Sequence, residues 1–336
     1  MYGASFFLLF LGIIAYFYVE ANYLEVTRFS IKSDKLVNKF KGKKIVQLGD
    51  LHGKSFGKNN ERLIELIDKE RPDVVFITGD MIEADRKNYQ AALALLKDLS
   101  KKYKVFYVTG NHEHKALEKK YKDEYMEYFR QVKDLDIERV NNQKLVLDPN
   151  FKVFKRETLS EDYGIKSSNN MIDSGELAEE DDSIDEKDID QASFAKKKKQ
   201  KKYRYLNLYG LVLPFDSYRY MFSNRKSKEI NKEYIEHKLG KLDKDECNFL
   251  LAHNPLLFDE YAKWGPDYVF SGHVHGGIVR IAKKGLFSPD RKFFPKYSFG
   301  EYERGNSKMF VTKGLGSSAL KVRINCRPEI LSIKFE

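Results

Sequence analysis

Two histidines stand two residues apart in the stretch "SGHVHGG" (residues 271–277), between glycines and directly after an apolar run. The chain has only 7 histidines among 336 residues, so the pairing needs an explanation. His273 and His275 could be turn residues whose rings cap backbone groups. They could equally be metal ligands, because neutral imidazole is a common ligand of divalent metals. The rest of the chain has to distinguish the two interpretations.

Several other apolar runs of strand length end in residues with metal-binding side chains. These residues are Asp50, His52, Asp80, Asn111, His112 and His253. Each of them alone is ordinary turn chemistry. Together they form an ordered series, and in an open α/β sheet ligands bind at the carboxyl ends of the strands. Imidazole, carboxylate and amide groups suit Mn, Fe or Zn, and their number is sufficient for two ions.

The apolar runs themselves predict the elements that position these residues. Strands are expected in "KKIVQLGDLHG", "RPDVVFITGD" and "KVFYVTGNHEH", with helices between them in "NNERLIELIDKE" and "YQAALALLKDLSKKY". This alternation predicts a parallel sheet with right-handed crossovers. Later strands are expected in "KYRYLNLYGLVL", "NFLLAHNP", "DYVFSGHVHGG", "KMFVTKGLG" and "EILSIKFE", and a helix in "KEINKEYIEHKL". We therefore predict an α/β domain of two packed mixed β-sheets flanked by helices.

The N-terminal segment has the composition of a membrane helix. Its first 19 residues carry no charge, and a helix of that length spans about 28 Å, close to the hydrocarbon thickness of a bilayer. Aromatic residues at 16–18 would sit at the interfacial belt. A cleaved signal peptide is the alternative, because Val19-Glu20-Ala21 resembles a cleavage site, but the basic n-region is missing. We predict an uncleaved anchor helix over residues 1–20.

Charge and composition divide the remainder of the chain. Seven basic residues lie between 28 and 44 and none precedes the apolar segment. By the positive-inside rule, a single-pass protein of the cell membrane would keep its catalytic domain on the cytoplasmic side. Residues 21–42 are predicted to be a juxtamembrane linker and 43–336 the folded domain.

Residues from about 157 to 202 hold an acidic block and then a lysine run without apolar period, which predicts a disordered insertion.

The net charge and the cysteine count narrow the class of protein. Lys and Arg number 60 against 50 Asp and Glu, and the net charge of +10 suits phosphorylated substrates, anionic lipid headgroups or nucleic acid. Two cysteines are too few for a disulfide framework, which excludes a disulfide-dense scaffold.

The ordered motifs resemble those of the calcineurin-like metallophosphoesterase superfamily. Its pattern is Asp-x-His, Gly-Asp, Gly-Asn-His-Glu/Asp, a lone His and Gly-His-x-His. Here these read "GDLHG" (49–53), "GD" (79–80), "GNHE" (110–113), His253 in "LLAHNP" and "GHVH" (272–275). The resemblance runs from about residue 43 to the C-terminus. It is nearest to a membrane-associated bacterial branch in which Gly-Gly follows the last motif and a "CRPEI"-like segment ends the chain.

The resemblance implies a role for each residue of the series. One ion would be held by Asp50, His52 and His275, the other by Asn111, His253 and His273, with Asp80 as the bridge. Physics also requires an anionic bridge, because two dications about 3.5–4 Å apart repel each other. A hydroxide bridging the ions would be the nucleophile. His112 would act on the substrate side, donating a proton to the leaving oxygen or positioning the phosphoryl group. Glu83, where many members carry Asp, would orient His112.

These inferences predict a metal-dependent phosphoesterase that hydrolyses phosphodiester, phosphomonoester or pyrophosphate bonds with two divalent ions. The anchor favours a phosphorylated small-molecule or lipid substrate over nucleic acid, and no oligomeric state is predicted. The alternative is a non-catalytic basic module that binds anionic lipid or nucleic acid at a membrane surface. No metal position of the pattern is missing, which favours the enzyme. Further candidates are Arg280, Lys313 and Arg323 as phosphate contacts or surface residues, and Glu113 and His114 as structural or pocket-lining residues.

Deleting residues 171–202 should leave folding and hydrolysis nearly unchanged, because a charged aperiodic segment contributes little to a core. Thermal unfolding and hydrolysis by the deletion variant and by the full chain provide the comparison. A fall in melting temperature of more than about 5 °C, which for a large domain corresponds to more than 1 kcal/mol, would reveal a structured element there.

Overall fold

The computed structural model of the protein describes residues 2–36, 38–118, 120–158, 205–218, 229–281, 284–287, 293–317 and 322–336. The helices are α1 (Tyr2–Asn22), α2 (Glu61–Glu70), α3 (Gln90–Lys102), α4 (Asn111–Leu117), α5 (Lys122–Lys133), α6 (Lys232–Leu239) and α7 (Phe258–Trp264). The insertion predicted over 157–202 lies outside the described residues, except that residues 157 and 158 end strand β7.

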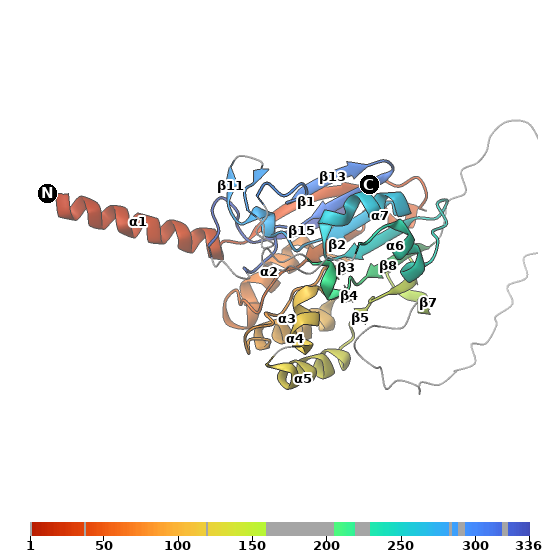
Figure 1. Cartoon of the computed structure of the whole chain (residues 1–336), viewed down its shortest axis with the longest axis horizontal. Helices are drawn as coiled ribbons and strands as arrows, with labels where there is room; N and C mark the ends of the chain where they lie inside the picture. The colour runs from red at the N-terminus through yellow and green to blue at the C-terminus, as the bar shows by residue number, and fades with distance from the viewer. Residues whose placement is uncertain are drawn as a thin grey trace, which may run out of the picture.

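The strands form two large mixed sheets and one short hairpin (Figure 1). The first sheet has the order β1-β15-β2-β3-β4-β5 and the second the order β13-β14-β10-β9-β8-β6-β7. The strand bounds are β1 (Glu25–Ile31), β2 (Lys44–Leu48), β3 (Val74–Ile77), β4 (Lys104–Tyr107), β5 (Glu138–Arg139), β6 (Gln143–Leu147), β7 (Val153–Thr158), β8 (Leu206–Leu211), β9 (Asn248–Ala252), β10 (Tyr268–Ser271), β11 (Arg280–Ile281), β12 (Lys284–Gly285), β13 (Gly300–Arg304), β14 (Ser307–Val311) and β15 (Glu329–Phe335).

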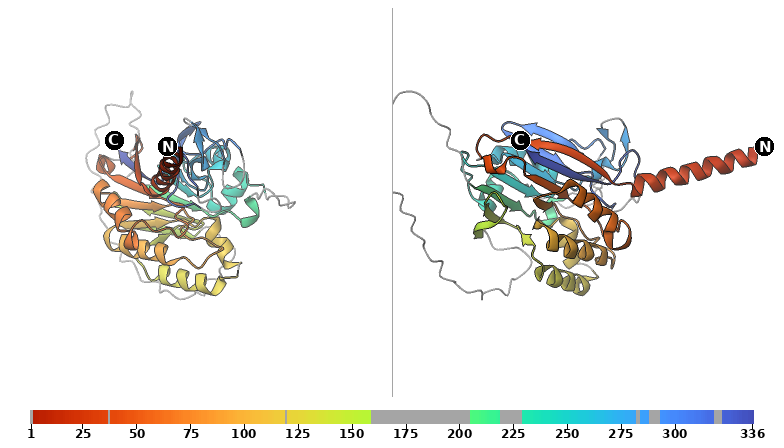
Figure 2. Two further views of the ribbon diagram at one scale, coloured as in Figure 1. Left: turned by 90° about the vertical axis from the view of Figure 1, so that its left-hand side faces the viewer. Right: turned by 180° about the vertical axis from the view of Figure 1, so that it is seen from behind.

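The two sheets pack face to face through an aromatic core. Phe76 and Phe106 of the first sheet meet Phe249, Phe270 and Phe310 of the second, and the rings of Phe76 and Phe270 are 5.1 Å apart at the centroids. Aromatic side chains bury large areas and interlock edge to face, which fixes how the sheets sit on each other. Helices α2, α3 and α5 cover the outer face of the first sheet, and α6 and α7 that of the second (Figure 2). The predicted α/β class with two packed mixed sheets is confirmed.

Part of the segment expected to be a linker is a strand. Residues 25–31 form β1, which pairs in parallel with β15 at the edge of the first sheet. Val26 packs on the helical side, whereas Phe29 and Ile31 pack into the core between the sheets, as the period of two in a strand requires. Only two residues separate α1 from β1, so α1 leaves the domain directly from its first strand.

Helix α1 has the length and composition to cross a membrane, and it projects away from the domain (Figures 1 and 2). Its apolar span is Ser5–Asn22, 18 residues of which 6% are buried. Among the described residues it is the one helix with these properties.

Candidate metal centre

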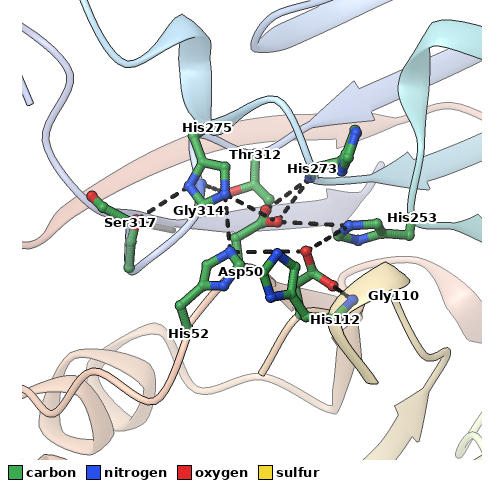
Figure 3. Close-up of polar contacts among 12 residues, drawn as sticks. Asp50, His52, Gly110, His112, His253, His273, His275, Thr312, Gly314 and Ser317 are labelled. Atoms are coloured by element: carbon green, nitrogen blue, oxygen red, sulfur yellow. Dashed lines mark hydrogen bonds and ion pairs between the residues drawn. The ribbon is translucent and has the colours of Figure 1, made fainter. Parts of the chain in front are cut away.

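The carboxyl ends of the central strands from both sheets meet at one edge of the sandwich. The loops after β2, β3 and β4 approach the loops after β9 and β10, and their polar side chains point toward one another (Figure 3). All these side chains are buried except His112, which is 12% exposed. The residues brought together are Asp50, His52, Asp80, Glu83, Asn111, His112, His253, His273 and His275.

A first group of possible metal ligands consists of Asp50, His52 and His275. One ligand atom of each lies within 4.8 Å of the others. The Nε2 atoms of the two imidazoles are 3.0 Å apart, and that of His275 is 3.7 Å from Asp50 Oδ1. The carboxylate is held in place by the backbone N–H of His273, which donates to Oδ1 at 2.9 Å and Oδ2 at 3.0 Å.

A second group joins Asp80, His253 and His273. His253 Nε2 lies 3.1 Å from Asp80 Oδ2 and 3.1 Å from the side-chain oxygen of Asn111. The same oxygen of Asp80 is 3.8 Å from His52 Nε2. One carboxylate oxygen therefore faces imidazoles of both groups.

The protonation of His275 suits a metal ligand. Its Nδ1 lies 3.2 Å from the carbonyl oxygen of Gly316. A carbonyl only accepts hydrogen bonds, so this contact places the ring hydrogen on Nδ1 and leaves a lone pair on Nε2. Burial, His52 and Arg323 together hold the pKa of His275 well below its usual value. The ring is therefore neutral, which is the form that coordinates metals.

The contacts and charges of His253 and Asp80 are compatible with a cation-binding centre. His253 Nδ1 donates to the carbonyl oxygen of Thr78 at 2.6 Å, so Nε2 points at Asp80 and Asn111. Burial lowers the pKa of His253, but Asp80 and other negative charge outweigh it and raise the pKa to about 10. Burial also disfavours the Asp80 carboxylate, yet His253 and His112 hold its pKa well below the usual range. The ligand set fits cations bound between imidazoles and carboxylates.

Much of the centre adopts a backbone conformation that is unfavourable for residues with a side chain. Five of the proposed ligands have a positive φ: Asp50 (53°), His52 (49°), Asp80 (54°), His273 (69°) and His275 (51°). Such positions cost on the order of 1–3 kcal/mol each and cluster at functional sites. The motif glycines allow the close approach, because a Cβ on Gly110 would clash with the Asp80 carboxylate and one on Gly272 with that of Asp50.

Glu113 supports the backbone beneath Asp80. One carboxylate oxygen accepts from the N–H groups of Asp80 and Gly110, both at 2.8 Å. The other accepts from Met81 N–H and the Tyr107 hydroxyl, both at 2.7 Å. The side chain is buried, and both of its oxygens accept hydrogen bonds from the backbone or from Tyr107. Of the two roles left open by the sequence, the structural one fits these contacts.

Glu83 contacts two histidines. Its Oε1 lies 3.0 Å from His112 Nδ1 and its Oε2 lies 3.3 Å from His52 Nδ1. Burial disfavours the carboxylate, but the two imidazoles outweigh this and hold the pKa of Glu83 far below its usual value. The His112 backbone N–H also donates to Asp80 Oδ1 at 2.8 Å. The contact of Glu83 with His52 was not foreseen, because it depends on tertiary structure.

Two basic residues considered as phosphate contacts or surface residues are buried and engaged in internal contacts. Arg323 donates to the carbonyl oxygens of Lys313 at 3.0 Å, Cys326 at 2.8 Å and Gly316. It thereby supports the carbonyl that binds His275. Lys313 Nζ pairs with Glu25 at 2.7 Å and Glu329 at 3.2 Å. The surface interpretation of both residues is therefore wrong, because a tertiary network satisfies their charges.

Sequence reasoning missed Tyr218, whose ring centroid is 5.2 Å from that of His273 and 6.4 Å from that of His253. No motif surrounds it in the sequence, so no signal was available.

Comparison with known proteins agrees with this geometry. A family model for calcineurin-like phosphoesterases matches residues 43–277. The chain is 24% identical over 320 residues to the uncharacterized metallophosphoesterase YkuE of Bacillus subtilis (strain 168), covering 93% of this chain and 86% of that protein. It is 22% identical to an uncharacterized metallophosphoesterase of Aquifex aeolicus (strain VF5), covering 95% and 94%. A transmembrane protein with metallophosphoesterase domain from Danio rerio is 21% identical, over 92% of this chain and 56% of that protein.

Glu113→Gln should destabilise the protein by about 3 kcal/mol, because its amide would face buried N–H groups that now donate to a carboxylate. Equilibrium unfolding in denaturant provides the measurement. The control is Glu118→Gln, an exposed residue that caps the same helix, with an expected change within about 0.5 kcal/mol. Equal effects of the two substitutions would contradict the structural role of Glu113.

Proposed function

This chain belongs to the calcineurin-like phosphoesterase family and is a metal-dependent phosphohydrolase, and from this premise we propose that it works with two divalent ions. The observation that carries the proposal is the position of Asp80 Oδ2, 3.1 Å from His253 Nε2 and 3.8 Å from His52 Nε2. A single anionic oxygen between two groups of ligands is what two neighbouring dications require. The nitrogen-rich ligand set favours Mn, Fe or Zn.

Two of the three groups of possible metal ligands assign the ligands in the proposal. The third group, His52, Asp80 and His112, shares two residues with them, and its His112 is assigned to the substrate side. Asp50, His52 and His275 would hold one ion. His253 and His273 would hold the other, with Asn111 beside His253 as the amide ligand. Asp80 would be shared. The carbonyls of Thr78 and Gly316 fix the tautomers of His253 and His275, so that Nε2 of each is the coordinating atom.

When bound, the two ions supply Lewis-acid chemistry, which activates water as a nucleophile and neutralises charge on the phosphoryl oxygens. The chain contributes the proton at the other end of the reaction. The His112 side chain is 12% exposed, against 1% for His52, and Glu83 holds its Nδ1. Burial lowers the pKa of His112, but Asp80 and Glu83 outweigh it and raise the pKa above the usual value. The protonated ring would donate from Nε2 to the leaving oxygen.

The proposed substrate lies in or at a membrane. Helix α1 leaves the domain within two residues of its first strand, and it has the length of a single membrane crossing. We propose a phosphorylated small molecule or a lipid-linked phosphodiester, phosphomonoester or pyrophosphate as substrate. The proposed organisation is an anchor (1–20) and a domain that begins with β1 (Glu25–Ile31) and lies on the cytoplasmic side of the cell membrane. The basic residues after α1 support this orientation.

Asp80→Asn should abolish hydrolysis of an aryl phosphodiester assayed with added Mn²⁺, and it should lower metal content together with turnover. The reason is that the variant removes the negative charge of the proposed bridge between two cation sites. Metal per chain by elemental analysis and turnover are measured on the same sample. Asp85→Asn, five residues along the same loop and exposed, is the control and should retain both. If Asp80→Asn kept its metal and its activity, the bridging role would be refuted.

His112→Gln should lower the rate by roughly 10²–10⁴-fold while metal content stays normal, as expected for a positioned acid. The loss should shrink for nitrophenolate, a leaving group that needs little protonation. Glu83→Gln should behave in the same way but more weakly. The matched control is His114→Gln on the same helix, whose ring contacts Thr109 at 3.0 Å. Loss of one metal ion from His112→Gln would show that His112 is a ligand instead.

A further inference from the structure

The last turns of α1 are fixed to the domain. Glu20 is buried and accepts from the backbone N–H of Cys326 at 2.9 Å and from Arg327 Nε at 2.8 Å. One turn earlier, the Tyr16 hydroxyl donates to the side-chain oxygen of Asn325 at 3.2 Å. The segment 325–327 therefore lies alongside the helix over residues 16–20. A freely swinging tether would show none of these contacts.

This attachment limits how far the domain can stand from a membrane. If residues 16–22 of the apolar span Ser5–Asn22 lie beside the domain, residues 5–15 of that span remain, and they cover about 17 Å at 1.5 Å per residue. The hydrocarbon core of a bilayer is about 30 Å thick. For α1 to cross it, the part of the domain that holds Tyr16 has to reach the interface of the membrane.

An apolar surface lies at that part of the domain. Its exposed side chains, here called the rim patch, are Ile281 (65%), Phe293 (68%), Phe294 (65%) and Val322 (43%). Outside α1, the other large apolar side chains exposed among the described residues are Tyr23, Met126 and Phe154. Exposed apolar clusters of this kind mark interaction sites on soluble domains.

Hydrogen bonds connect the rim patch to the helix. Asn325, which binds Tyr16, also donates to the carbonyl of Arg280 at 3.4 Å, the residue before Ile281. Arg280 N–H donates to the carbonyl of Ile324 at 3.0 Å. The N–H of Phe294 donates to the carbonyl oxygen of Leu286, and the N–H of Leu286 donates to the carbonyl oxygen of Val279. Strand β11 lies beside the base of α1 in two opposite views (Figures 1 and 2).

Basic side chains surround the same end of α1. Arg62 donates to the carbonyl of Asn22 at 3.1 Å, and the Arg327 guanidinium lies 5.1 Å from the ring of Tyr23. Lys284 is exposed on the hairpin partner of β11. Arg327 also pairs with Glu20 at 2.8 Å and Glu25 at 3.5 Å, which leaves Arg62 and Lys284 as exposed cations at this end of the domain. An apolar patch with exposed cations beside it matches the boundary between acyl chains and anionic headgroups.

We propose that the rim patch inserts into the interface of an anionic lipid bilayer beside α1, so that the folded domain itself lies on the membrane. Insertion of the rim patch requires that α1 is a membrane helix, and it requires neither the proposed metals nor a substrate. Insertion of the rim patch would also fix the position of the metal centre relative to the membrane. Cys326, whose backbone N–H binds Glu20 of α1, also contacts the metal centre, because its thiol lies 3.3 Å from the carbonyl oxygen of the proposed ligand His275.

The test measures the depth of single tryptophans in the full chain, reconstituted in vesicles of phosphatidylcholine and phosphatidylglycerol. The only native tryptophan, Trp264, is 2% exposed and gives a constant background. Phe294→Trp and Ile281→Trp each place a probe in the rim patch. Phe154→Trp is the matched control, because Phe154 is 67% exposed and lies on β7, at the far side of the domain from α1 (Figure 1).

Lipids brominated near the headgroup end of the acyl chains should lower the emission of both rim-patch probes by about half, since interfacial side chains lie roughly 5–10 Å into that boundary. The Phe154→Trp probe should be unaffected. Red-shifted rim-patch emission that iodide quenches and brominated lipid does not would place the patch in water. Blue-shifted emission that neither quenches would place it against a second copy or another protein. Either result overturns the proposal. Hydrolysis by the three tryptophan variants should equal that of the unchanged protein, whichever emission result is found.

Discussion

A buried negative charge between two sets of imidazoles is the constraint on which this structure depends. The Asp80 carboxylate is buried between two sets of imidazoles, and an isolated charge in such a place costs several kcal/mol unless it is paired. His253 and the N–H of His112 contact it directly. The N–H groups of the loop that carries it are in turn satisfied by Glu113. Metal binding and local folding are therefore parts of one electrostatic arrangement.

The two-sheet architecture serves this arrangement. No single strand end offers enough ligands, so the centre needs the ends of β2, β3 and β4 to face those of β9 and β10. The aromatic core holds the sheets at a fixed angle, and Gln47 of the first sheet donates to the carbonyl of Ser271 in the second at 2.9 Å. Ser271 comes two residues before His273. Each group of ligands takes residues from both sheets, so a shift of one sheet against the other would break both groups.

Sequence patterns predicted the parts of the structure that depend on local spacing. Buried strands such as β3 are continuous apolar runs, which is why the fold class could be predicted. The polar residues at the ends of these strands have the order of a known motif series, which is why the site residues could be expected to lie together. The edge strands were missed for a physical reason. β13 reads "GEYER", and its backbone pairing with β14, rather than an apolar period, makes it a strand. Burial of Arg323 and the docking of Glu20 were also missed, because both depend on partners far along the chain.

The central claim is that Asp80 joins two cation sites into one centre. It is tested most directly by crystals of the protein grown with Mn²⁺, with anomalous scattering recorded above the manganese edge. The account predicts two peaks of similar height about 3.5–4 Å apart, with an oxygen of Asp80 between them and His112 bound to neither. A single peak, or two peaks of which only one contacts Asp80, would contradict it.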